Sequence, residues 1–124
     1  MSWRYEQVTG RMYAANGDLV GVGYSGFADC KNNPFTQSIH DRGPIPQGVY
    51  HIGTAVNTVT HGPFVLPLTP DPGNTMFGRD GFLIHGDSIV SPGTASEGCI
   101  IMSRDVREAI AISGDTDLEV IAGI

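Results

Sequence analysis

Two segments of the sequence decide the fold and point to its chemistry: FLIHGD at residues 82–87 and ASEGCII at residues 95–101. In the first, three apolar residues typical of a short buried strand lead directly into His85. In the second, a turn of small residues places Gly98 immediately before Cys99, 14 positions after the histidine. A thiol attacks a carbonyl carbon only as the thiolate, so a catalytic cysteine requires a neighbouring imidazole that takes its proton. The two segments therefore predict a cysteine–histidine pair, delivered by a strand and a glycine turn.

The residues beside this pair suit the same chemistry. Gly98 leaves the backbone bare next to the thiol, which permits close approach of a substrate and lets backbone N–H groups point at a developing oxyanion. The histidine needs a third group that fixes its tautomer, and either the carbonyl of Gly86 or the carboxylate of Asp87 can supply it.

Each residue also has a simpler interpretation. Cys99 can be a small buried hydrophobic residue, His85 a surface or hydrogen-bonded residue, and Asp87 and Glu97 solvated turn formers. A zinc site formed by His85, Asp87 and Cys99 is a further alternative, but no Cys-x-x-Cys or His-Glu-x-x-His motif supports it. Two cysteines do not make a disulfide framework, and a Cys30–Cys99 bridge stays an alternative.

Around these segments, the composition favours a turn-rich β protein. The chain has 124 residues, the size of one domain, and its 17 Gly and 8 Pro make up roughly a fifth of it, against about 12% on average. Charged residues are only 16% and hydrophobic residues 40%, which argues against both a coiled coil and disorder. We expect one domain over residues 1–124, mostly β (α+β), with a single late helix.

The pattern along the chain predicts where the elements lie. Asn16-Gly17 is a strong two-residue hairpin signal between two of the predicted strands. Pro63, Pro67 and Pro70 limit the segment at 64–68 to an edge strand or a turn. Ser103 is a candidate N-cap and Gly114 a candidate end for the only helix. The remaining predictions are strands at 3–8, 11–15, 19–24, 49–52, 82–84 and 118–121, and a long loop at 25–44.

Charge and hydropathy exclude several classes of function. The formal net charge is −6, with scattered basic residues, so nucleic-acid binding is a poor expectation. No apolar run approaches the ~20 residues of a membrane span. The first residues, MSWRYE, carry no apolar signal core, so we expect no signal peptide and a cytoplasmic location in the producing cell.

The two opening segments together resemble the signature of L,D-transpeptidases of the YkuD type. That family has His-Gly, a loop, and then Ser-His-Gly-Cys, usually with Arg two places further on; here the residues are 84–86 and 96–100. The segment IPQGVYHI at 45–52 is similar to the family's Thr-Pro-x-Gly-x-Phe-x-Ile. Papain-like and NlpC/P60-type cysteine peptidases place Cys before His, so the chain order disfavours them.

A narrower resemblance is closer. Residues 43–50, 78–87 and 96–100 resemble the type VI secretion L,D-transpeptidase effectors, as do 23–26 and 32–34 in the early loop. The resemblance spans about residues 3–102, and it implies a YkuD-like β-sandwich domain that requires no cofactor.

Carried over residue by residue, the resemblance makes Cys99 the nucleophile and His85 its base, oriented by the main-chain carbonyl of Gly86. Glu97 stands where the broader family has His, and Ile101 stands where it has Arg. Without that Arg, we expect Arg79 or, second, Arg104 to anchor the substrate carboxylate; the alternative for Arg79 is a surface turn residue. The full set predicted to bind substrate or the oxyanion is Ser96, Glu97, Gly98, Arg79, Asp87 and Tyr50.

The resemblance implies the tetrapeptide stem of peptidoglycan as substrate and a Cys thioester as intermediate. Water, a free D-amino acid or a second stem would then complete carboxypeptidation, exchange or cross-linking. Two alternatives stay open: a non-catalytic wall-binding module on the same scaffold, and a cysteine amidase or peptidase that cuts elsewhere in the stem. Action in the periplasm of a target bacterium, type VI secretion components and a periplasmic immunity protein are the implied setting. A phage lysis protein is the other setting that fits these features.

Overall fold

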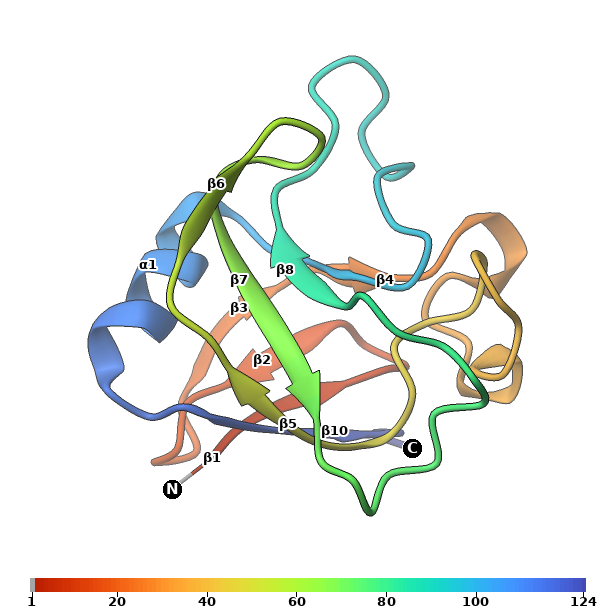
Figure 1. Cartoon of the computed structure of the whole chain (residues 1–124), viewed down its shortest axis with the longest axis horizontal. Helices are drawn as coiled ribbons and strands as arrows, with labels where there is room; N and C mark the ends of the chain where they lie inside the picture. Colours follow the sequence, from red (N-terminus) through yellow and green to blue (C-terminus); the bar gives the residue numbers. More distant parts are fainter. Residues whose placement is uncertain (1) are drawn as a thin grey trace.

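Strands make up most of the regular structure in the computed structural model, which describes residues 2–124 (Figure 1). The expectation of a mostly β domain with one helix is confirmed within these residues. Two 3₁₀ turns, η1 (Ala28–Cys30) and η2 (Pro34–Thr36), lie in the early loop, and the helix α1 covers Arg104–Ser113. The strands are β1 (Ser2–Glu6), β2 (Arg11–Tyr13), β3 (Leu19–Val22), β4 (Tyr24–Ser25), β5 (Gly48–Ile52), β6 (Val56–Thr58), β7 (Gly62–Pro70), β8 (Leu83–His85), β9 (Ile100–Ile101) and β10 (Asp117–Ile121).

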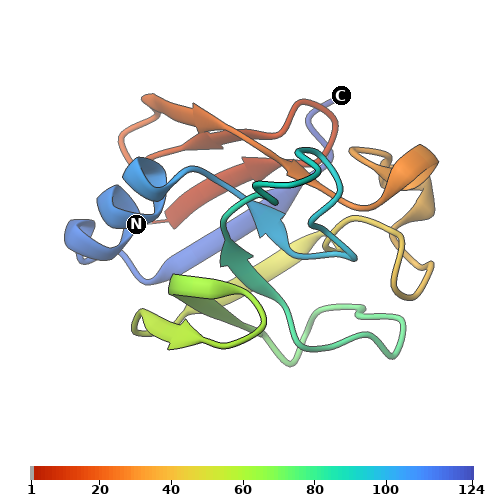
Figure 2. The ribbon, with the colours of Figure 1, turned by 90° about the horizontal axis from the view of Figure 1, so that it is seen from above.

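The strands form one continuous sheet that bends round the core. Its order is β3-β2-β1-β10-β5-β7-β8-β9-β4, with β6 paired to β7 outside this path. The two ends of this order, β3 and β4, are separated in the chain by Gly23 alone, so the sheet must curve until its ends meet (Figure 2). A Cβ at Gly23 would lie 1.7 Å from the carbonyl oxygen of Ile101, so only glycine fits this close passage.

The centre of the sheet explains why these residues form strands. β1 and β10 run parallel, and Trp3 is paired with Leu118 and Tyr5 with Val120. These four side chains are buried, whereas their neighbours in the strands alternate outward, as the period of two requires. Each fully buried large apolar side chain contributes about 1.5–3 kcal/mol.

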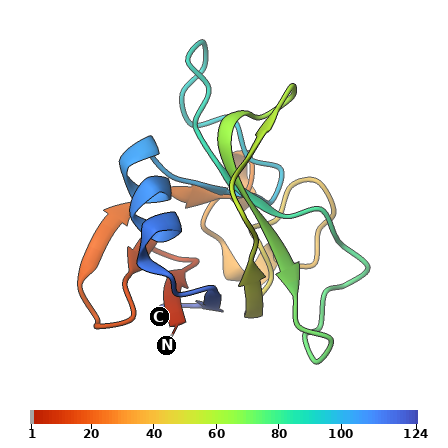
Figure 3. The same ribbon diagram turned by 60° about the vertical axis from the view of Figure 1, so that its left-hand side comes forward.

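Helix α1 packs at the side of the sheet, as Figure 3 shows. Its Val106 and Ile110 are buried in the core. Ser103 caps the helix by accepting a hydrogen bond from the Val106 N–H, and Gly114 ends it in the left-handed conformation with φ of 78°. The predicted helix and both of its ends are therefore confirmed.

The region around the three prolines differs from the prediction. β7 is a nine-residue strand inside the sheet order and not an edge strand or a turn. It changes partners along its length: its first half pairs with β6, Leu66 and Pro67 pair with β8, and 68–70 pair with β5. Pro67 lies where the partner changes and Pro70 lies at the end of the strand, where a missing N–H is tolerated. The partner strand β6 was not predicted.

Two exposed segments extend from the same end of the molecule in Figures 1 and 3. One is the β6–β7 hairpin, and the other is the loop between β8 and β9, residues 86–99. β8 lies between them in the fold, so the residue at its end faces the space that the two segments border.

Candidate active site

The parallel pair of β8 and β9 brings the predicted histidine and cysteine together. Ile84 is paired with Ile100, and both are fully buried in the core. Because side chains alternate along a strand, His85 and the residue preceding Ile100, Cys99, lie on the opposite face of the sheet. The Met102 N–H donates to the carbonyl of His85 at 3.0 Å, which extends the ladder past the histidine.

Both side chains line one cavity of about 430 Å³. Its wall comes from distant parts of the chain: residues 40–41, the hairpin residues 60–61, residues 78–82 and residues 97–99, together with His85 and Ala95. The side chains in this wall include three carboxylates, from Asp41, Asp80 and Glu97, and one guanidinium. The cavity is therefore acidic, apart from the charge of its histidines.

His85 is held in one tautomer by the backbone. It is 3% exposed, and its Nδ1 lies 2.9 Å from the carbonyl oxygen of Gly86. Since a carbonyl only accepts, Nδ1 carries the proton in the neutral ring and Nε2 is left as the basic nitrogen. Of the two orienting groups left open by the sequence, the structure uses Gly86. Burial lowers the pKa of His85, against the opposing effect of the Gly86 carbonyl.

Cys99 is a partly exposed thiol in a desolvated position. Its Sγ lies 3.9 Å from the carbonyl oxygen of Gly81, to which the thiol donates. Burial raises the pKa of Cys99 to about 11, although the Leu83 backbone N–H and the Arg79 guanidinium favour the thiolate. Both shifts favour the neutral forms of the thiol and the imidazole. Cys30 and Cys99 are both free, so the alternative of a disulfide between them is wrong.

Ser96 holds the turn that presents the thiol. Its fully buried Oγ accepts from the N–H groups of Gly26 at 2.9 Å and Gly98 at 3.1 Å, and it donates to the carbonyl of Cys99 at 2.6 Å. Ser25 Oγ donates to the carbonyl of Gly98 at 2.9 Å. The Gly98 N–H is thus already used, so it is not an oxyanion donor in this arrangement, and Ser96 orders the turn instead of facing the cavity.

Gly98 has a steric role instead. Its φ is 144°, and a Cβ there would lie 2.5 Å from Nη2 of Arg79 and 3.0 Å from Cε1 of Phe82. Glycine at this position lets the turn lie directly against the Arg79 side chain.

The Arg79 guanidinium lines the cavity but is occupied by the backbone. The side chain is 6% exposed and lies over the Phe82 ring, with 5.2 Å between its Cζ and the ring centroid. Its Nη1 and Nη2 donate to four carbonyl oxygens: Gln37 at 2.6 Å, Gly43 at 2.8 Å, Pro44 at 2.8 Å and Glu97 at 3.3 Å. These bonds argue for a role in joining the loops around the site. An anchoring role for Arg79 toward a substrate carboxylate would have to compete with them.

Two further predicted residues, Arg104 and Tyr50, lie outside the cavity wall. Arg104 pairs with Glu108 at 3.0 Å and stacks on Phe64. Tyr50 is fully buried in the core, where its hydroxyl donates to the carbonyl of Pro46 at 2.7 Å. Tyr50 was predicted to contact the substrate, and the structure corrects this prediction. Side chains alternate along β5, and this alternation points Tyr50 into the core.

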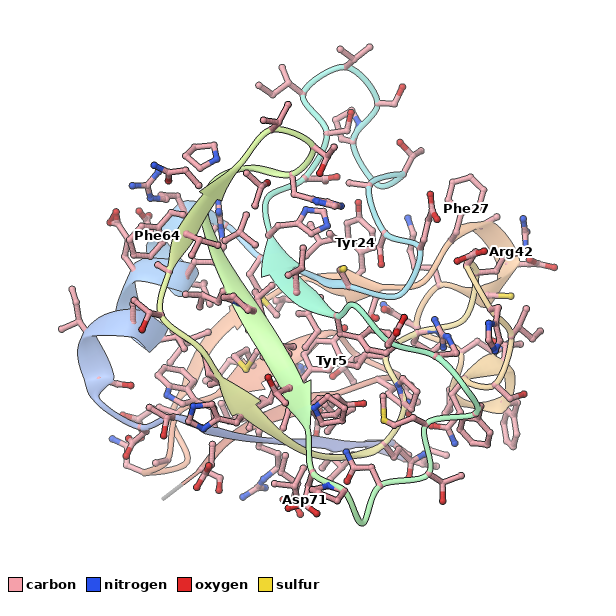
Figure 4. All side chains as sticks on the ribbon, in the orientation of Figure 1. Tyr5, Tyr24, Phe27, Arg42, Phe64 and Asp71 are labelled. Atoms are coloured by element: carbon pink, nitrogen blue, oxygen red, sulfur yellow. The ribbon has the colours of Figure 1, made fainter. Side chains whose placement is uncertain are left out.

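Asp87 organises the loop that follows β8. Its carboxylate accepts from the Tyr24 hydroxyl at 2.6 Å, from the Ser88 N–H at 2.8 Å and from the Gly93 N–H at 3.1 Å. Figure 4 labels Tyr24 beneath this loop. Asp87 thus neither orients the histidine ring nor lines the cavity, in contrast to its predicted role. Glu97 is exposed in the cavity wall, where it was predicted.

Two more histidines line this cavity, and they were not predicted from the sequence. His61 comes from the β6–β7 hairpin, and its ring centroid lies 4.6 Å from that of His85. His40 comes from the early loop, and its Nε2 lies 2.8 Å from the carbonyl oxygen of Phe77. Neither belongs to a motif, and only long-range contacts of the hairpin and of the early loop bring them to the site.

Two properties of residues 2–124 bear on other classes of function. No group of three or more His, Cys, Asp or Glu side chains in this range is placed to hold a metal ion. In the same range, no helix has both the length and the apolar character needed to cross a bilayer.

Comparisons with known proteins fit this architecture. A family model described as the Tlde1 domain matches residues 21–117. Among solved structures, that of Bd1075 from Bdellovibrio bacteriovorus is similar to this chain, with a TM-score of 0.60 and 14% identity over 98% of this chain. The chain spans about half of that protein, 47% of its length, and at this identity the likeness shows the fold alone. No curated protein matches the sequence.

Proposed function

The chain belongs to the Tlde1 domain family of type VI secretion L,D-transpeptidase effectors, and from that premise we propose that Cys99 performs thioester chemistry on peptidoglycan stems. The family implies a peptidoglycan-modifying enzyme. One observation carries the finer assignment: β8 and β9 present His85 and Cys99 to the same acidic cavity, with Nδ1 of the histidine fixed on the Gly86 carbonyl.

The proposed first step transfers a proton and forms a carbon–sulfur bond. His85 Nε2 takes the proton of the Cys99 thiol while Sγ attacks the carbonyl of the third, L-configured centre of the tetrapeptide stem. The tetrahedral intermediate collapses, the bond to the terminal D-alanine breaks, and the imidazolium gives its proton to the leaving amine. A thioester on Cys99 and free D-alanine result.

The second step repeats the proton transfers with an acceptor. His85 takes a proton from water, a D-amino acid or the amine of a second stem as this group attacks the thioester. The product then leaves and the imidazolium returns its proton to the thiolate. Because burial raises the pKa of Cys99 and lowers that of His85, the proposed mechanism couples deprotonation of the thiol to its attack on the carbonyl.

The proposed place of action is the periplasm of a target bacterium, since the stem peptides lie there. The family's link to type VI secretion supports delivery by that apparatus, and a producing cell would need a periplasmic immunity protein. We infer no cofactor, because each proton and electron pair in these steps comes from the thiol, the imidazole, the stem or the acceptor.

Intact-mass spectrometry of the protein with a tetrapeptide muropeptide or a carbapenem tests the proposal. We expect a Cys99 adduct and release of D-alanine, both lost in Cys99→Ala, with release also lost in His85→Ala. Cys30→Ala is the matched control, since it removes the other free thiol and should keep the adduct. Turnover by Cys99→Ala would exclude this nucleophile, unchanged stems would favour a binding module, and longer released peptides would indicate a different peptidase.

A further inference from the structure

The imidazole of His61 lies against the imidazole of His85. Their ring centroids are 4.6 Å apart and the ring planes are inclined by 53°, and both rings line the cavity that contains Cys99. The two histidines come from different segments, the β6–β7 hairpin and the end of β8 (Figure 1).

The two threonines that precede His61 in the hairpin hold this residue in place. Thr58 Oγ1 accepts from the His61 N–H at 2.8 Å, and Thr60 Oγ1 lies 2.9 Å from its Nδ1. These contacts hold the tip of the hairpin in a defined turn and give the His61 ring a defined partner.

Helix α1 fixes the base of the same hairpin. Arg107 is 7% exposed, and its Nη1 donates to the carbonyls of Pro63 at 2.9 Å and Phe64 at 2.8 Å. Arg104 lies over the Phe64 ring, with 4.6 Å between its Cζ and the ring centroid, and Figure 4 labels Phe64 beside the helix. Two arginines of one helix thereby set the position of the strand that follows His61.

We infer that His61 is a positioning residue for His85: its ring lies against the base, confines it beside Cys99 and forms part of its electrostatic environment. This inference rests on the proposed function, in which His85 must be neutral to accept the thiol proton. His61 does not need to touch the substrate for this role.

The charged groups that face His85 come from each neighbouring segment. They are His61 from the hairpin, Arg107 from α1, Asp87 from the loop after β8, and Cys99 and Glu97 from the turn before β9. His61 and Arg107 lower the pKa of His85, and Asp87 raises it.

The direction of the effect follows from this arrangement. A phenylalanine at position 61 keeps a ring against His85 but removes the charge, so His85 should hold its proton up to a higher pH. The acid limb of kcat/KM should then move up, by roughly half a pH unit, because solvent screens a charge on an exposed side chain. An alanine removes the ring as well, and looser placement of the base should lower kcat roughly tenfold.

The experiment compares wild type, His61→Phe, His61→Ala and the control Val59→Ala by D-alanine release against pH and by NMR titration of the His85 ring. Val59 is fully exposed on the same hairpin and outside the cavity wall. The expected result is an upward shift of the His85 midpoint and of the acid limb in His61→Phe, a loss of kcat in His61→Ala, and a Val59→Ala protein that behaves as wild type. Identical titration midpoints and pH profiles in wild type and His61→Phe would overturn the inference. Wild type that releases no D-alanine would defeat the proposed function instead, while the NMR midpoint would still decide whether the two rings are coupled.

Discussion

The wall formed by β1, β10 and β5 and the catalytic end formed by residues 25–47, 78–82 and 86–99 use different interactions to hold their shape. In the wall, alternating apolar side chains such as Trp3, Tyr5 and Leu118 are buried, and charges stay outside. In the catalytic end, buried polar side chains such as Arg79 and Ser96 bind backbone carbonyls and N–H groups of loops. Packing between apolar side chains tolerates small shifts in atomic position, whereas these hydrogen bonds hold individual atoms in place. We therefore expect wall substitutions to change stability alone and catalytic-end substitutions to change activity as well.

The largest effect is expected from Arg79→Met. Methionine fills part of the volume but leaves the carbonyls that Arg79 now binds without partners in a buried region. We expect a loss of about 3–5 kcal/mol in the free energy of unfolding and loss of D-alanine release. Urea unfolding and a muropeptide assay measure the two. If Arg79→Met unfolded with the wild-type free energy, these carbonyls would be readily hydrated without Arg79. The hydrogen bonds at this end of the molecule would then not hold its shape as we infer.

Leu118→Ala tests the wall. The side chain is fully buried in β10, and its truncation leaves a cavity, so unfolding should require about 2–5 kcal/mol less free energy. Activity per folded molecule should not change, since β10 lies away from the cavity residues. A drop in kcat at full folding would show that the wall and the site are coupled.

Ser96→Ala should separate the two regions most clearly. It removes one donor and one acceptor that serve three backbone groups around Cys99, and the cost should be about 1–3 kcal/mol. Because the turn loses its fixed geometry, kcat should fall roughly tenfold or more, whereas a wall substitution of equal cost should leave kcat unchanged. Ser88→Ala, in the exposed part of the loop, is the matched control.

A smaller effect concerns pH and stability. Burial lowers the pKa of His85, so the native protein binds fewer protons than the unfolded chain, whose histidine titrates near about 6.5. The free energy of unfolding should therefore fall as pH decreases below about 6.5, until the native His85 is protonated as well. Urea unfolding at several pH values should show a weaker dependence in His85→Gln. An unchanged dependence would assign it to other groups.

The smallest effect is expected on the outer face of the wall. Arg4 and Glu119 lie 4.0 Å apart, and each side chain is 52% exposed. Solvent screens such a pair, so Arg4→Ala should change the free energy of unfolding by about 0.5 kcal/mol or less. Thermal unfolding in low and high salt measures this contribution. A loss of more than about 1 kcal/mol in the free energy of unfolding would contradict the expectation for such an exposed ion pair.

The same contrast explains which parts of the structure could be predicted from the sequence. The strands of the wall and helix α1 follow from local alternation and from the caps Ser103 and Gly114, which act within a few residues. The cysteine–histidine pair could be predicted because the His-Gly motif lies at the end of a short apolar strand, so that the motif and the local pattern identify the same residues. β7 was wrongly predicted to be an edge strand or a turn. Its prolines lie where the strand changes pairing partners, and those changes depend on the whole sheet.

The polar contacts of the site join residues that lie far apart in the sequence. They could therefore not be predicted from the local pattern. The four carbonyls that bind Arg79 lie 18 to 42 positions from it in the chain. His61 carries no motif, and it reaches His85 only because β7 lies beside β8. Side-chain pattern alone therefore located the proposed nucleophile and base but not the groups that hold them in place.

The place of β10 in the sheet has a consequence for how the chain acquires its structure. The last strand lies between β1, the first, and β5, so it joins the two halves of the sheet order. Until residues 117–121 have left the ribosome, β1 and β5 have no shared neighbour and the two halves cannot close on one core. Contacts between the ends of the sequence also slow the search for the native topology. Folding should thus be completed only after residues 117–121 have been synthesised.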